Sequence, residues 1–151
     1  MNNGNNAPEP MLDDLYRELI LDHYRHPRNR GHLERKTAGA EGYNPVCGDE
    51  IAVDVELDGG RITNVGFVGR GCSISQASGS MMTDAVKGLT KDEAIRLAET
   101  FKRLMTNPED AVPAELGDLE AFQGVAKFPV RVKCATLAWH VLEEGLEKVE
   151  T

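Results

Sequence analysis

Three short segments hold every cysteine of this 151-residue chain, and the fold must bring them together. They are residues 44–49, 71–75 and 128–134, which contain Cys47, Cys72 and Cys134. Gly48 allows a tight turn after Cys47, so the Cys47 thiolate and the Asp49 carboxylate can be aimed at one point. Three sulfur ligands and one carboxylate oxygen suit tetrahedral Zn²⁺, and the same four ligands could hold an iron–sulfur cluster.

Charge and composition exclude several classes of protein. The formal net charge is −8, which disfavours a nucleic-acid partner because phosphate binding depends on Lys and Arg. The chain begins with a polar segment rather than a secretory signal, and it has no apolar run long enough to span a bilayer. An odd number of cysteines cannot all pair within the chain. We therefore expect a cytoplasmic protein whose reduced thiols bind metal or take part in chemistry.

The hydrophobic pattern after the first cysteine predicts an antiparallel hairpin. Apolar residues alternate with polar ones over 51–57, residues 58–60 form a turn signal, and 61–70 reads as the return strand with a bulge near Asn64. A short edge strand is expected near 37–41. An antiparallel pair of this kind places Asp49 beside Cys72.

Helical spacing of apolar residues accounts for most of the remaining chain. It predicts helices over 11–26, 73–88 and 90–107, a short helix and turn over 113–123, and a final helix over 134–149. We read residues 1–10 as a flexible tail and 11–151 as one domain. The fold class expected is α+β.

Two of the cysteines are predicted at helix N-termini. Cys72 precedes one helix and Cys134 opens another, and both positions favour a thiolate over a thiol. Arg131 and Lys133 are placed to offset the negative charge of a thiolate site or to contact an anionic group of a partner, and Arg131 is the better suited to such a contact. A single free cysteine is often only a small buried hydrophobe, but three of them beside Gly, Asp and basic residues argue for a site. A purely structural zinc is the remaining alternative, although such sites usually show paired C-x₂-C spacing.

Other candidate residues are given structural roles. His23 and His26 lie three apart on one helix face, which invites a metal site, but we favour a role at the helix C-terminus. Trp139, Met81 and Met82 are expected to pack in the core or at its edge. Several acidic residues are read as solvated helix faces: Asp13, Asp14, Glu143, Glu144 and Glu147.

The three segments together resemble the cysteine motifs of the IscU/NifU N-terminal superfamily. The matching motifs are Asn44-Pro45-x-Cys47-Gly48-Asp49, Gly69-x-Gly71-Cys72-x-Ile74-Ser75-x-Ala77-Ser78 and Arg131-x-Lys133-Cys134-Ala135-x-Leu137. Within the superfamily the chain is similar to the SufU branch. The interval between Cys72 and Cys134 is longer than in IscU, and residues 91–123 hold the extra length as an insertion. Lys133 stands where IscU has histidine, and the Leu-Pro-Pro-Val-Lys segment of IscU is missing.

The resemblance implies a small antiparallel sheet of about three strands covered by helices. It implies Zn²⁺ bound by Cys47, Asp49, Cys72 and Cys134, and a sulfurtransferase that accepts persulfide sulfur on Cys47. The donor would be a PLP-dependent cysteine desulfurase of the SufS type, one of whose histidines displaces Cys47 from zinc. Cluster assembly proteins would receive the sulfur. The alternative kept open is an assembly scaffold that holds a transient [2Fe-2S] cluster on the same ligands.

Overall fold

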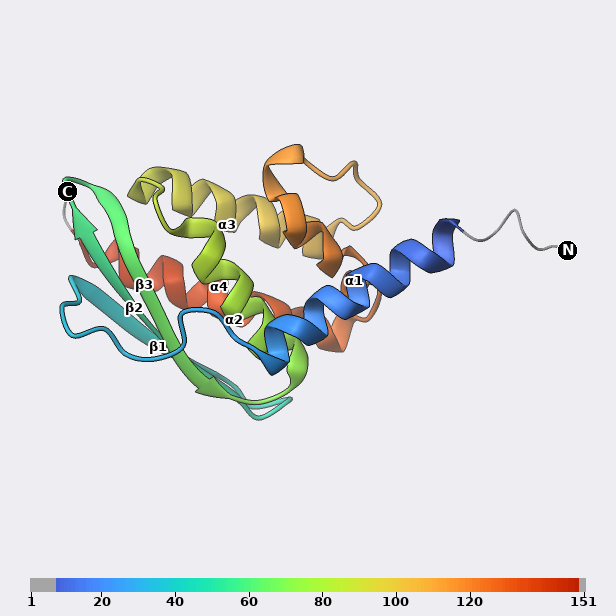
Figure 1. Ribbon diagram of the computed structural model, residues 1–151, viewed down its shortest axis with the longest axis horizontal. Coiled ribbons are helices and arrows are strands. Elements are labelled where there is room, and N and C mark those ends of the chain that lie inside the picture. The colour runs from blue at the N-terminus through green and yellow to red at the C-terminus, as the bar shows by residue number, and fades with distance from the viewer. Residues whose placement is uncertain (1–7, 150–151) are drawn as a thin grey trace, which may run out of the picture.

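Figure 1 shows a computed structural model that describes residues 8–149, with side chains described from residue 15 onward. Within this range the strands are β1 (Ala38–Asn44), β2 (Asp49–Asp58) and β3 (Arg61–Arg70). The α-helices are α1 (Pro8–Arg25), α2 (Ser73–Val86), α3 (Lys91–Thr106) and α4 (Pro129–Glu147). Two 3₁₀ segments, η2 (Ala114–Gln123) and η3 (Val125–Lys127), connect α3 to α4. The α+β class is confirmed.

The sheet is antiparallel throughout, in the order β1-β2-β3. The predicted hairpin turn is present, and Gly59 and Gly60 both have positive φ (63° and 80°), as a two-residue hairpin requires. The register between β2 and β3 shifts at Glu56 and Leu57, opposite Asn64, which confirms the predicted bulge. The edge strand is longer than expected and ends by pairing Asn44 with Asp49. The β1–β2 turn and the end of β3 therefore lie at the same end of the sheet.

Helices cover one face of the sheet in two layers (Figure 1). Helix α4 packs across β1 and β2, while α2 packs against β3. Helix α1 lies on α2, and α3 lies on α4. The strands send their apolar side chains into this core, and the largest buried ones are Ile51, Val53, Val55, Ile62 and Phe67. The first helical layer thus holds Cys134, on α4, and Cys72, immediately before α2, close to the sheet.

The segment 91–123 thickens the helical layer. Phe101 on α3 stacks on Trp139 of α4, with ring centroids 5.0 Å apart, and meets Phe122 of η2 edge-on at 5.7 Å. Trp139 is fully buried, so its predicted packing role is confirmed. Met81 and Met82 are likewise buried in the core. This aromatic cluster packs α3 against α4 and η2 against α3, and it extends the core away from the sheet.

Several helix boundaries differ from those predicted. Helix α1 begins at Pro8, so part of the predicted tail is helical, and residues 1–7 lie outside the described residues. Helix α4 begins at Pro129, so Cys134 lies within the helix and does not open it. Proline is favoured at the first helical position because its missing N–H would be unpaired there anyway. No helix in the described part of the chain has both the length and the apolar character to cross a bilayer.

The prediction that Glu143 is solvated is wrong. Glu143 is only 7% exposed and bonds Lys102 of α3 through its Oε1. Glu144 and Glu147 are exposed as expected, whereas the side chains of Asp13 and Asp14 lie outside the described residues. The acidic face of α4 is therefore interrupted where α3 packs against it.

Candidate metal centre

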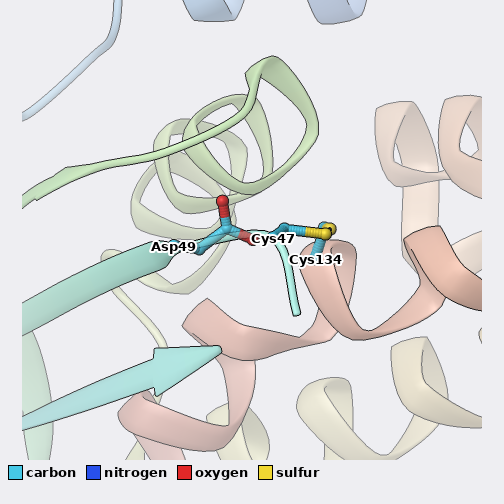
Figure 2. Close-up of side chains that lie close together, drawn as sticks. All are labelled: Cys47, Asp49 and Cys134. Carbon is cyan, nitrogen blue, oxygen red and sulfur yellow. The ribbon is translucent and has the colours of Figure 1, made fainter. Parts of the chain in front are cut away.

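The predicted ligands come from four different places in the fold. Cys47 lies on the turn between β1 and β2, and Asp49 is the first residue of β2. Cys72 is the residue immediately before α2, as predicted, and Cys134 points inward from α4. Figure 2 shows the side chains of Cys47, Asp49 and Cys134 converging at the end of the sheet. The antiparallel hairpin and the contact between α4 and the sheet together bring these side chains close to one another.

Three of the ligand atoms form a tight group. The ligand atoms of Cys47, Asp49 and Cys134 lie within 4.8 Å of one another, and the sulfurs of Cys47 and Cys134 are 2.8 Å apart. All three cysteines are free thiols. Cys72 stands at the edge of this group, with its Sγ 3.9 Å from Asp49 Oδ2. The structure therefore brings three of the four predicted ligands into one group and places Cys72 next to Asp49 at its edge.

Asp49 is held rigidly and completely buried. Its Oδ1 accepts a hydrogen bond from the Cys72 backbone N–H at 2.8 Å, and its Oδ2 accepts one from Asn44 Nδ2 at 3.3 Å. None of the ion pairs among the described side chains involves Asp49. A buried carboxylate without a cation is costly, because its lost hydration is not repaid by an opposite charge. The donor set of carboxylate and thiols therefore fits a bound cation, and zinc in particular.

Asn44 is a functional residue whose role sequence reasoning missed. Its Nδ2 also approaches Cys134 Sγ at 3.8 Å, and its Oδ1 accepts a hydrogen bond from the Val46 N–H at 3.2 Å. One buried amide thus orients two ligands and shapes the turn that carries Cys47. The sequence signal for this role is the position of Asn44 as the first residue of the first cysteine motif.

The backbone before Cys72 passes close to Asp49. Gly71 has φ +145°, and a Cβ there would stand 2.2 Å from Asp49 Oδ1. Only glycine allows this approach, because any side chain would push the carboxylate out of place. The short distance also permits the hydrogen bond from the Cys72 N–H.

The cysteines differ in exposure. Cys134 is fully buried, whereas Cys47 and Cys72 are half-buried. Burial raises the pKa of the Cys134 thiol far above its usual value, and the neighbouring Cys47 and Cys72 add to the rise. The predicted helix N-terminus does not act on Cys134, since it lies inside α4. A coordinated metal ion reverses this preference, because a metal-bound thiol is deprotonated.

Arg131 lies beside the thiols, in the first turn of α4. Its pKa is raised, chiefly by attraction to a negative Cys72, with partial burial opposing and with Cys134 and Cys47 adding to the rise. Lys133 is exposed. Arg131 is thus placed to stabilise negative charge on the sulfurs, while its contact with a partner stays a prediction.

The two histidines considered as ligands do not join the group of thiols and carboxylate. His23 is buried, and its Nδ1 is 2.7 Å from Ser80 Oγ on α2. Burial lowers its pKa, and Arg28 adds to the lowering. His26 is exposed and lies 3.7 Å from Asp22. His23 therefore helps to fix α1 on α2.

The sequence of this chain is similar to those of several known proteins. The NifU-like N terminal domain family matches residues 15–148. The zinc-dependent sulfurtransferase SufU of Bacillus subtilis (strain 168) is 48% identical over 139 residues, covering 92% of this chain and 94% of that protein. The iron–sulfur cluster assembly scaffold protein IscU of Streptococcus pyogenes serotype M1 is 44% identical, covering 91% and 86%.

A solved structure supports the same assignment. It is a protein of Fervidobacterium islandicum AW-1 described as a candidate iron–sulfur cluster assembly scaffold for the SUF system. It superimposes with a TM-score of 0.81 at 36% identity, covering 85% of this chain and 94% of that chain. The fold, the order of the cysteine motifs and these matches agree. The chain belongs to the NifU-like N terminal domain family.

Proposed function

We propose that this protein is a zinc-dependent sulfurtransferase that accepts persulfide sulfur from a SufS-type cysteine desulfurase and passes it to iron–sulfur cluster assembly. The observation that carries the proposal is the placement of Cys47. It is a half-exposed thiol on a turn, set against a buried carboxylate and two further thiols. The 48% identity to a zinc-dependent sulfurtransferase over most of both chains supports it.

Zinc would be bound by Cys47, Asp49, Cys72 and Cys134. When bound, Zn²⁺ keeps thiolates deprotonated near neutral pH without undergoing redox chemistry itself. Three of these residues are fixed by the framework: Asp49 by its hydrogen bonds, Cys72 at the start of α2 and Cys134 within α4. Cys47 is the ligand with freedom to move, because its turn has Gly48 at φ +72° and an exposed Val46.

The sulfur-transfer step follows from the chemistry of thiolates. The Cys47 thiolate attacks the outer sulfur of the donor's cysteine persulfide, forming a new S–S bond as the donor's S–S bond breaks. The electron pair of the broken bond leaves on the donor cysteine as a thiolate. The transferred sulfur keeps its proton, so Cys47 becomes a persulfide and no net oxidation occurs. Arg131 stabilises the negative charge near the exchanging sulfurs.

The test mixes zinc-loaded protein with a SufS-type desulfurase and L-cysteine and follows alanine production. We expect strong acceleration that is lost with metal-stripped protein and with Cys47→Ser. Val46→Ser is the matched control, since it alters the same exposed turn without removing the thiol. Mass spectrometry of the trapped protein should find one added sulfur atom on Cys47. Full acceleration by Cys47→Ser would rule out Cys47 as the acceptor.

A cluster scaffold is the second candidate, and the 44% identity to an IscU scaffold protein favours it. Here iron and sulfide would be the cargo, assembled on the same thiols and Asp49. The two functions separate in one experiment. No acceleration of the desulfurase, together with uptake of iron and labile sulfide, would establish the scaffold and exclude the sulfurtransferase.

A further inference from the structure

A large groove opens between α1, the η2–η3 segment and the start of α4. Its volume is about 790 Å³, within the range of protein binding sites. Its floor is mainly apolar and includes Ile20, Ile74, Ala121, Val125 and Phe128. The sulfur-transfer step described above does not account for this groove.

The charges of the groove are opposite to those of the molecule as a whole. The chain has a net charge of −8, yet Arg17, Lys127 and Arg131 all line the groove. Among the described side chains, none of these three forms an ion pair with a carboxylate. Two carboxylates lie near one wall of the groove: burial raises the pKa of Tyr16, and Glu120 and Asp118 add to the rise. Three cations around an apolar floor are complementary to a ligand with apolar groups and carboxylates.

The groove lies beside the thiol site. Ser73 and Ile74, which line it, directly follow Cys72 on the chain. Arg131 also lines the groove and lies one turn before Cys134 on α4. A ligand in the groove would therefore be held next to the sulfur-transfer centre.

Exposed apolar side chains beside the groove indicate a polypeptide occupant rather than a small molecule. Val130 at the start of α4 is 61% exposed and Leu15, next to groove-lining Tyr16, is 62% exposed, and neither residue lines the groove. A small ligand would cover the floor and leave these side chains in water. Exposed apolar surface that continues beyond a groove is typical of protein–protein contacts.

We propose that this groove is the docking site for a protruding segment of the sulfur-donating desulfurase, a segment with apolar anchors flanked by carboxylates. The assignment of the partner rests on the proposed function. Apolar side chains of the segment fill the floor, and its carboxylates pair with Arg17 and Lys127 at the rim. Docking there brings the donor persulfide to Cys47 past Arg131.

The experiment measures binding of the zinc-loaded protein to a SufS-type desulfurase by titration calorimetry, without L-cysteine, so that no chemistry occurs. We expect Lys127→Glu and Arg17→Glu each to weaken binding about tenfold and to flatten its salt dependence. Arg35→Glu changes the net charge equally at an exposed position in the loop after α1, and we expect it to leave binding nearly unchanged. Phe128→Ala should weaken binding as well, while Tyr24→Ala, an exposed aromatic on α1, should not.

Three outcomes would overturn the docking site. Equal losses for Lys127→Glu and Arg35→Glu would mean that only net charge matters. Unchanged binding by all three groove variants, with full desulfurase activation, would reject the groove and leave the proposed sulfurtransferase function intact. A wild-type protein that neither binds nor activates the desulfurase would reject the proposed function together with its docking site.

Discussion

The residue before Cys72 must be glycine for the site to form. A side chain at Gly71 would have to occupy the space of the Asp49 carboxylate, since its Cβ would lie 2.8 Å from Asp49 Cα as well as 2.2 Å from Oδ1. Real Cβ atoms do not approach other atoms so closely, so either the carboxylate or the backbone must move. The position therefore controls the geometry of the predicted metal ligands without being one of them.

We predict that Gly71→Ala weakens zinc affinity by about 10–100-fold, the effect usual for residues that orient metal ligands. Competition with a chromogenic chelator measures this. Gly88→Ala is the matched control, because Gly88 also has positive φ (+94°) but has nothing within 4 Å of its added Cβ. It should cost stability through backbone strain yet keep its affinity for zinc. Equal affinity of the two variants would show that displacement of Asp49 does not matter.

Individual residues could be predicted from sequence where a local pattern determined them. The cysteines and Asp49 were recognisable from their setting beside Gly48 and Gly71, and the hairpin alone predicted that Cys72 meets Asp49. Asn44 could not be assigned, because its bonds to Asp49 and Cys134 depend on contacts 5 and 90 residues away along the chain. The burial of Glu143 was missed for a similar reason. Its helix face appears solvated until α3 is packed against it.

The presence of each helix and strand was easier to predict than the residues at which it begins and ends. The alternation of apolar and polar residues, the Gly59-Gly60 turn and the bulge near Asn64 can all be predicted from the sequence, since each depends on neighbouring residues. The start of α4 was not, although Pro129 is a helix-start signal. Placing the start at Cys134 gave that thiol a helix N-terminus it does not have. Moving the start to Pro129 puts Arg131 in the first turn and Cys134 in the core.

A partly buried ion pair joins α3 and α4 beside their aromatic contact. Lys102 Nζ bonds Glu143 Oε1 and lies 3.4 Å from Glu99, with side-chain exposures of 22% for Lys102 and 10% for Glu143. Removing the Glu143 carboxylate would leave the partly buried Lys102 ammonium with only Glu99, which is exposed and more distant, as its partner. Burial raises the pKa of Glu143, so removing this carboxylate relieves a desolvation cost, whereas, against the effect of burial, Glu143 and Glu99 raise the pKa of Lys102. We expect the loss of the hydrogen bond to the ammonium to be the larger effect.

We predict that Glu143→Ala lowers the free energy of unfolding by about 2 kcal/mol. Glu144→Ala, one residue along the same helix but exposed, should stay within about 0.5 kcal/mol of the parent protein. Urea denaturation followed by Trp139 fluorescence gives both values. The fluorescence also reports directly on the contact, because Trp139 stacks on Phe101 of α3. Equal stability of the two variants would mean that the ion pair contributes nothing.

At the scale of the whole molecule, the proposed metal site joins the sheet, α2 and α4. Its predicted ligands come from the β1–β2 turn, the first residue of β2, the residue before α2 and the interior of α4. These segments approach one another only in the folded chain, so the unfolded chain lacks the site. Zinc that binds the folded state alone must therefore stabilise the entire domain through mass action.

We predict that, at free zinc of about 100 times its dissociation constant, the ion adds about 2.7 kcal/mol to the free energy of unfolding. For a chain of this length the melting temperature should rise by about 5–10 °C relative to protein in chelator. Calorimetric scans of the parent and of Cys72→Ser test this, with a smaller zinc-dependent rise expected for the variant. An identical melting temperature with and without zinc, while metal analysis finds one ion bound, would place that ion outside the centre formed by folding. The buried Asp49 would then need another cation, and the ligand set proposed for sulfur transfer would have to be abandoned.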